Sequence, residues 1–341
     1  MTTYILGAGA SVHAGYPLLS DMPSVLKIWA TETDSPSLSK IDWLCHQITQ
    51  QSTGEGSSNL EQALTALEAA PNERVKLTDG TWFYTHLLLG DLADMIAMFF
   101  DSRRTDANSR AYRILASEVI RPGDAVITFN YDVTLEKELA AVGKWDVGTG
   151  YGFPIFPDRN SPVQILKLHG STNWMPLTDG HLGGGTYNPV DPFGYRPMIP
   201  DAELQWLGFS GLSDPLLSTG NALLGAPRRH TLLLPTLAKK FPGRMWTGLW
   251  IRAKEILGDS SRVAMLGYSL PEADEMARTL ILGQCRRDAR IVLRCRSRTN
   301  SLAAEFHSAG FGSIDGDDTR DFEKWLDEEA NPGSEGRRSS P

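Results

Sequence analysis

Three side chains at the ends of two apolar segments have the types and spacing that chemistry on a polar substrate needs. Asn130 and Asp132 follow the apolar run 125–128, and His169 follows the run 163–168. Residues two apart on an extended segment point to the same side, so this amide and this carboxylate can hold a polar leaving group and place a water molecule. Histidine titrates near neutral pH and can act as a general base. These three residues are our candidate catalytic group.

Each of them also has a purely structural interpretation. Asn and Asp both favour helix starts, so Asn130 and Asp132 could form an Asx turn that caps a helix expected over 134–142. A lone histidine after an apolar strand is more often a buried group whose hydrogen bonds are satisfied within the fold. What favours a catalytic His169 is its place before a glycine at the carboxyl end of a strand. His13, in the first expected helix, is a second candidate base.

A glycine turn near the start of the chain has the form of an anion-binding site. The strand expected over 2–7 runs into Gly7-Ala8-Gly9-Ala10-Ser11, and a helix is expected to follow. Glycines lack the Cβ atoms that would block a pyrophosphate, and a helix N-terminus attracts anions. The turn departs from the dinucleotide fingerprint, because Val12 replaces the third glycine and no acidic residue ends a second strand about 20 residues later. This departure argues against a dehydrogenase, and a mere tight connection is the structural alternative.

Apolar segments that end in small or polar residues alternate with helical patterns along the chain. After the first three such segments, a fourth strand is expected at 262–266 and a fifth at 291–295, with helices expected over 245–257 and 273–283. This alternation indicates the α/β class, with a doubly wound, Rossmann-like parallel sheet. In such sheets ligands bind at the carboxyl ends of the strands.

Four short motifs in this order resemble the sirtuin family, and most closely its bacterial, zinc-free, NAD-consuming branch. They are GAGAS at 7–11, TFNYD at 128–132, LHGS at 168–171 and GYSLP at 267–271. The resemblance implies an NAD+ hydrolase that cleaves the nicotinamide–ribose bond, gives nicotinamide and ADP-ribose, and depletes NAD+ in bacterial anti-phage defence. It also implies that Asn130 orients the nicotinamide ribose and the water, that Asp132 holds the carboxamide and that His169 is the base.

The same resemblance implies which residues bind NAD+. They are Gly7, Ala8, Gly9, Ser11, Thr128, Gly267, Tyr268 and Ser269. The GAGAS turn would hold the pyrophosphate, and the segment 267–269 would lie on the adenosine side. The structural alternative for that segment is a strand-to-helix turn with Ser269 or Glu272 near a cap. Asp274 could serve a ribose or simply begin a helix. The family's asparagine is missing at 294–298, so no adenine contact is assigned.

Two other functions stay open at this point. Sirtuin deacylases carry a four-cysteine zinc module, whereas Cys45, Cys285 and Cys295 are scattered and none belongs to a CxxC pair. We therefore expect no bound metal. The first alternative to hydrolysis is an NAD+-dependent protein deacylase or ADP-ribosyltransferase. The second is a non-catalytic module that binds NAD+ or ADP-ribose.

A large helical insertion is expected at about 20–120, between the first and second strands. Within it, an apolar stripe at helical spacing over 88–100 indicates core packing rather than a cofactor site. Residues 175–229 are rich in Gly, Pro and Asp, and are expected to form a loop or lid over the site. Residues 1–330 are expected to form one domain, and the polar tail 331–341 is expected to be disordered.

The net charge and the hydropathy of the chain limit the kinds of partner that we expect it to bind. A formal net charge of -8 over 341 residues argues against direct nucleic-acid binding. No apolar run reaches the ~18 residues of a membrane helix, and no signal peptide is recognisable, so we expect no membrane partner and a cytoplasmic location. A cytoplasmic NAD+ hydrolase must be restrained. The broad apolar stripes of the insertion therefore predict a homo-oligomer, and a separate sensor or ATPase protein is a possible partner.

Overall fold

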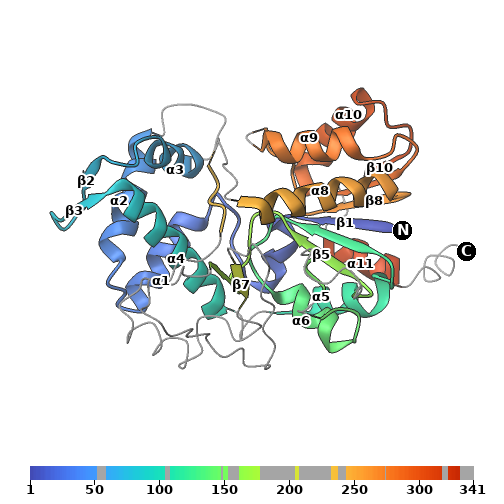
Figure 1. Ribbon diagram of the computed structural model, residues 1–341, viewed down its shortest axis with the longest axis horizontal. Coiled ribbons are helices and arrows are strands. Elements are labelled where there is room, and N and C mark those ends of the chain that lie inside the picture. Colours follow the sequence, from blue (N-terminus) through green and yellow to red (C-terminus); the bar gives the residue numbers. More distant parts are fainter. Residues whose placement is uncertain are drawn as a thin grey trace, which may run out of the picture.

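A six-stranded, all-parallel sheet forms the centre of the molecule (Figure 1). The computed structural model describes residues 1–51, 59–103, 108–146, 149–152, 161–176, 204–206, 232–236, 243–272, 274–316 and 322–330. The strands are β1 (Thr2–Leu6), β4 (Ala125–Thr128), β5 (Gln164–Lys167), β8 (Arg262–Leu266), β9 (Arg290–Arg294) and β10 (Ile314–Gly316). Their spatial order is β10-β9-β8-β1-β4-β5, the order of a doubly wound nucleotide-binding sheet. The predicted α/β class is confirmed.

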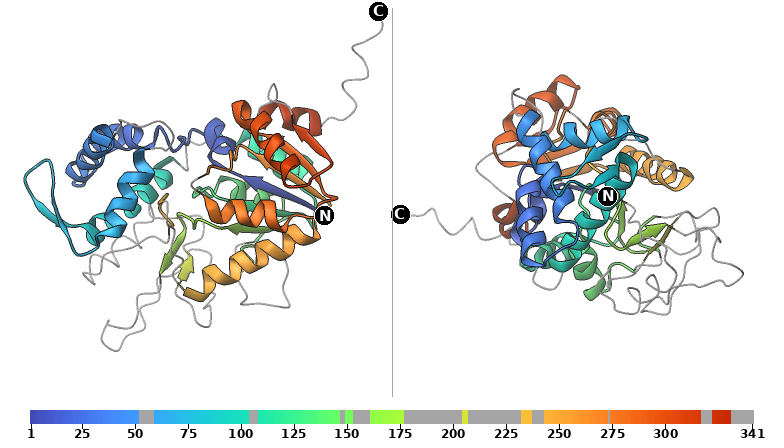
Figure 2. Two further views of the ribbon diagram at one scale, coloured as in Figure 1. Left: turned by 90° about the horizontal axis from the view of Figure 1, so that it is seen from above. Right: turned by 90° about the vertical axis from the view of Figure 1, so that its left-hand side faces the viewer.

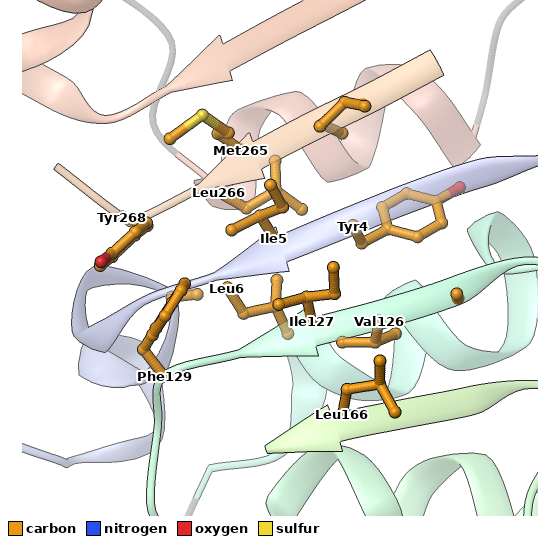
Figure 3. Close-up of a cluster of buried hydrophobic side chains, with 14 of the residues drawn as sticks. Tyr4, Ile5, Leu6, Val126, Ile127, Phe129, Leu166, Met265, Leu266 and Tyr268 are labelled. Carbon is orange, nitrogen blue, oxygen red and sulfur yellow. The ribbon is translucent and has the colours of Figure 1, made fainter. Parts of the chain in front are cut away.

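Helices cover both faces of this sheet. In Figure 1, α8 (Gly243–Asp259), α9 (Glu275–Gln284) and α10 (Thr299–Ser308) lie on one side, whereas α5 (Arg110–Ile114), α6 (Thr134–Ala141) and α11 (Phe322–Ala330) lie on the other. The central strands are buried on both faces, which is why they read as unbroken apolar runs instead of alternating ones. Figure 3 shows their side chains interlocked in the core.

The strand register places the last residues of five strands in one row across the sheet. Leu6 is level with Thr128 on one side and with Leu266 on the other. Thr128 is in turn level with Lys167, and Leu266 with Arg294. Residues that lie the same number of positions beyond this row are therefore found at the same edge of the sheet.

The helical insertion lies beyond the carboxyl ends of the strands (Figures 1 and 2). It contains α1 (Met22–Glu32), α2 (Leu38–Gln51), α3 (Asn59–Ala69) and α4 (Thr85–Arg103), and a hairpin of β2 (Arg74–Lys76) and β3 (Trp82–Tyr84). Its buried side chains form a second apolar cluster, distinct from that of the sheet. The stripe over 88–100 lies in this second cluster, so its predicted core role is confirmed. The hairpin was not predicted.

Other expectations have mixed outcomes. Leu232 forms an isolated antiparallel bridge with Gly170. Two further strands, β6 (Trp174–Pro176) and β7 (Leu204–Trp206), pair with each other, and the rest of the predicted lid 175–229 lies outside the described residues. The predicted disordered tail 331–341 also lies outside them. A π-helical turn, η2 (Leu115–Val119), precedes β4, and a 3₁₀ turn, η4 (Arg296–Arg298), precedes α10.

Candidate active site

Three of the predicted site residues lie at equivalent positions just beyond the carboxyl ends of their strands. Asn130, His169 and Tyr268 each lie two residues beyond the row of level strand ends, after β4, β5 and β8 respectively. The GAGAS turn starts from the same row, after β1. Because β1 is flanked by β4 and β8, the strand order reverses beside β1. Open α/β sheets bind ligands at the carboxyl ends of the strands next to such a reversal.

The glycines of the GAGAS turn are explained by the turn that follows β8. A Cβ atom on Gly7 would lie 2.6 Å from the Cα of Tyr268, and one on Gly9 would lie 2.8 Å from the carbonyl oxygen of Gly267. Gly267 has a φ of 62°, and a Cβ there would lie 2.1 Å from the backbone nitrogen of Ala10. Direct packing of two turns therefore requires glycine at these positions, whether or not a ligand also approaches.

Backbone N–H groups of this turn already have acceptors within the protein. Gly7 donates to the carbonyl of Leu266 at 3.2 Å, and Gly9 donates to that of Gly267 at 2.9 Å. The helix that follows is η1 (Ala8–Ala14), a seven-residue 3₁₀ helix, so the expected contribution of a long helix dipole is not available. Pyrophosphate binding by Gly7, Ala8 and Gly9 stays a prediction.

The Ser11 hydroxyl links the β1 turn to the segment after β4. It donates to Asp132 Oδ2 at 2.8 Å and accepts from Asn130 Nδ2 at 3.0 Å. The same Nδ2 donates to the carbonyl of Gly7 at 2.9 Å. The phenol of Tyr112 lies 2.7 Å from Ser11 Oγ and donates to it, because the Ser11 proton is used toward Asp132. The candidate residues Asn130, Asp132 and Ser11 thus form one buried network.

Asp132 has a structural role as well. Its Oδ1 accepts the backbone N–H of Thr134 at 3.0 Å, which is the Asx turn that the sequence offered as an alternative. Asn130 takes no part in that turn; its own N–H is bound by Thr128 Oγ1 at 3.1 Å. A carboxylate has about four lone-pair sites, so Asp132 retains acceptor capacity for a ligand N–H.

His169 faces a carboxylate on the residue that precedes α9. Its Nε2 lies 3.3 Å from Oδ2 of Asp274, and both side chains are buried. Tyr268 donates to the same oxygen at 3.0 Å. The ring of Phe129 meets the His169 ring edge-on, with centroids 4.9 Å apart, and stacks on Tyr268 at 4.2 Å. Figure 3 shows Phe129 and Tyr268 together beyond the strand ends.

Two buried phenols serve as donors in this region. Burial raises the pKa of Tyr112 well above its ordinary value, and it does the same to the pKa of Tyr268. Nearby carboxylates add to the effect, with Asp132 acting on Tyr112 and Asp274 on Tyr268. Both phenols therefore stay protonated at neutral pH and donate hydrogen bonds.

A buried ion pair supports the loop that carries Asn130. Lys167 Nζ lies 2.7 Å from Glu136 Oε1, and both side chains are almost fully buried. Lys167 also donates to the backbone carbonyl of Asp132. Burial raises the pKa of Glu136, while the Lys167 ammonium opposes that rise. The charged residue within the apolar run Ile-Leu-Lys-Leu was the available sequence signal, because a buried lysine must find a partner.

The remaining predicted residues have different settings. Ser269 is exposed after the β8 turn. His13 lies against the rings of Tyr112 and Phe322, where burial lowers its pKa, so it is a packed neutral group. Arg294, where the family asparagine was missing, is buried and pairs with Asp315 at 3.0 Å. Tyr112 and Glu136 were not singled out from the sequence.

Metal-site and membrane-spanning features are absent from the part of the chain that the structure describes. No group of three or more His, Cys, Asp or Glu side chains there is arranged to hold a metal ion. The three cysteines are not joined in disulfides. No described helix is both long and apolar enough to cross a membrane.

Comparison with known proteins gives Sir2 structures as neighbours. No protein-family model matches the chain, and no curated protein sequence matches it. A solved structure described as "The Structural basis of Sirtuin Substrate Affinity" is similar, with 11% identity, coverage of 98% of this chain and 94% of that one, and a TM-score of 0.45. "Sir2 bound to acetylated peptide" has 10% identity, coverage of 98% and 93%, and a TM-score of 0.43. "Structural Basis for the Mechanism and Regulation of Sir2 Enzymes" has 14% identity, coverage of 97% and 92%, and a TM-score of 0.42.

Proposed function

We propose that this protein is an NAD+ hydrolase that cleaves the nicotinamide–ribose bond. One observation carries the proposal: Asn130 and His169 lie at equivalent positions beyond two neighbouring strands, β4 and β5. The glycine turn after β1, where the strand order reverses, lies beside them. An amide, a base and an anion-binding turn are the groups that this reaction needs. The order of the four sirtuin-like motifs supports NAD+ as the substrate.

The proposed reaction breaks the bond between the nicotinamide nitrogen and C1′ of the ribose. Nicotinamide leaves as a neutral molecule, and the ribose passes through an oxocarbenium-like state. The oxygen of a water molecule bonds to C1′, and one proton of that water passes to His169. The net products are nicotinamide, ADP-ribose and a proton.

In this scheme Asn130 orients the ribose and the water, and Asp132 accepts the N–H of the nicotinamide carboxamide. Ser11 fixes the positions of these two side chains relative to each other through its two hydrogen bonds. GAGAS residues and the segment 267–269 bind the pyrophosphate and the adenosine side, with Thr128 supporting the Asn130 backbone.

NAD+-dependent deacylation or ADP-ribosyl transfer is the second candidate. The same Asn130, Asp132 and His169 would serve either reaction, because only the acceptor that attacks C1′ differs. Several neighbouring structures are described as Sir2 with peptide substrates, but they leave the acceptor of this chain open. Scattered cysteines favour water as the acceptor, since sirtuin deacylases carry a four-cysteine zinc module.

Nicotinamide release from NAD+ by the purified chain tests the proposal. We expect nicotinamide and free ADP-ribose without any peptide. His169→Ala should lower turnover by about 10²–10⁴-fold, the usual contribution of a general base. Asn130→Ala should lower turnover by a similar factor, because the ribose and the water are no longer oriented. Circular dichroism should show a retained fold for both variants. The matched control is His46→Ala, because His46 is an exposed histidine on α2, and turnover should stay at the wild-type level.

Three results would redirect the proposal. Release that needs an acylated peptide and yields an O-acyl-ADP-ribose would identify a deacylase. Tight binding of NAD+ or ADP-ribose without turnover would identify a binding module. Folded Asn130→Ala or His169→Ala protein with a rate within twofold of wild type would remove that residue from catalysis.

We further propose a biological role, mainly on the sequence resemblance. The enzyme would deplete NAD+ in the bacterial cytoplasm during phage infection, with activity set by homo-oligomer assembly or by a separate sensor or ATPase protein. The position of the helical insertion beyond the strand ends supports this, since assembly there would act close to the site (Figure 2). Phage plating on cells that express wild-type or His169→Ala protein tests the role, and equal plating would contradict it.

A further inference from the structure

Asp274 occupies a helix start without capping the helix. It is the residue before α9, the N-cap position, where an aspartate side chain ordinarily accepts a backbone N–H. Here the side chain makes no such bond, so the helix forgoes the stabilisation that this cap ordinarily gives. Its carboxylate turns instead toward the strand ends, where it meets Tyr268 and His169.

A single oxygen of Asp274 serves both partners. Tyr268 donates to Oδ2 at 3.0 Å, and His169 Nε2 lies 3.3 Å from the same atom. An ionised carboxylate only accepts hydrogen bonds, so the imidazole form that suits this contact carries its proton on Nε2. This contact is slightly longer than an ordinary hydrogen bond, and such contacts often shorten when substrate binds.

Packing restricts the histidine ring as well. Phe129 meets it edge-on, and Tyr268 in turn stacks on Phe129. Among the described residues, Arg278 on α9 and Glu61 on α3 also act electrostatically on the Tyr268 phenol. Asp274 is a carboxylate in direct contact with His169.

We propose that Asp274 is the positioning residue of His169: it holds the imidazole with its proton on Nε2, so that Nδ1 is the nitrogen that takes the proton from the attacking water. Tyr268 supports this arrangement by donating to the same oxygen. The inference rests on the proposed function for its catalytic meaning, whereas the tautomer itself is a property of the free protein.

Two measurements test the proposal. The first is Asp274→Asn, for which kcat for nicotinamide release should fall by at least ~10-fold, a part of the ~10²–10⁴-fold that a general base contributes. KM for NAD+ should stay within about 3-fold, because the side chain acts through His169. The matched control is Glu275→Gln, an exposed acid at the next position, which should leave kcat unchanged.

The second measurement is ¹⁵N NMR of histidine-labelled wild-type protein at neutral pH. His169, assigned by comparison with His169→Ala, should show the tautomer protonated on Nε2. This result needs neither turnover nor a folded Asp274 variant, so it separates failure of this inference from failure of the proposed function.

An Nδ1-protonated His169 in the wild-type protein would overturn the proposal. An Asp274→Asn variant that matches Glu275→Gln in kcat would overturn it too. If Asp274→Asn lowers both kcat and the free energy of unfolding while the His169 tautomer stays unchanged, Asp274 is merely structural.

Discussion

Replacing Lys167 by methionine should expose how strongly the buried ion pair constrains the loop before α6. Methionine has a similar length and no charge, so the Glu136 carboxylate would be left buried without its cation. Breaking such a pair by removing one partner costs about 3–5 kcal/mol of unfolding free energy. The hydrogen bond to the carbonyl of Asp132 is lost at the same time.

The loss should depend on pH in a direction that the structure sets. Burial already raises the pKa of Glu136, and Lys167 opposes that rise, so the substitution should raise this pKa further. A carboxyl group with a raised pKa in the folded state loses stability as pH increases above its unfolded pKa, by up to about 1.4 kcal/mol per pH unit. Lys167→Met should therefore be less destabilising at pH 5 than at pH 8.

Urea unfolding followed by circular dichroism at both pH values measures this. Lys254→Met is the matched control, since Lys254 is exposed on α8 and surface changes usually stay within about 0.5 kcal/mol. The double variant Lys167→Met with Glu136→Leu should regain most of the stability, because a buried pair is often replaceable by apolar side chains. An equal loss at pH 5 and pH 8, or a double variant as unstable as the single one, would refute the reasoning.

Three other expectations follow from features of the chain. Gly9→Ala should lower the thermal midpoint, because its Cβ would lie 2.8 Å from the carbonyl oxygen of Gly267; Gly258→Ala, which meets no atom within 4 Å, should not. Metal analysis of the purified protein should find no stoichiometric zinc, given the scattered cysteines, and one zinc per chain would reopen the deacylase alternative. Sedimentation should show a homo-oligomer at micromolar concentration, and a monomer that hydrolyses NAD+ at full rate without a partner would contradict the assembly hypothesis.

The long buried strands were predictable because their apolar runs have no other place in a folded protein. Strands β1, β4, β5, β8 and β9 all fall within one or two residues of the expected positions. The short elements were not predictable. β10 has three residues, of which only Ile314 is strongly apolar, and it forms at the edge only because β9 is already in place. Such strands carry no periodic signal of their own.

The sequence allowed the positions of residues that follow strands to be predicted, but not the positions of their distant partners. Asn130 and His169 could be placed at one edge because a parallel sheet gathers its carboxyl ends there. Tyr112 reaches Ser11 across 101 residues of sequence, a contact that no local pattern encodes. Asp274 looked like an ordinary helix start, and only the packed structure shows its carboxylate turned toward a histidine.

The central position of β1 has a consequence for how this protein is made. β1 pairs with β8, and Thr2 is level with Arg262, so the first strand must wait for a partner that a ribosome delivers about 260 residues later. At translation rates of about 5–20 residues per second, this interval is on the order of 10–50 s. Asp274 and the GYSLP turn emerge later still than the start of β8. An unfinished chain would therefore lack one wall of the candidate site, so the proposed NAD+ hydrolysis could not begin until the sheet closes.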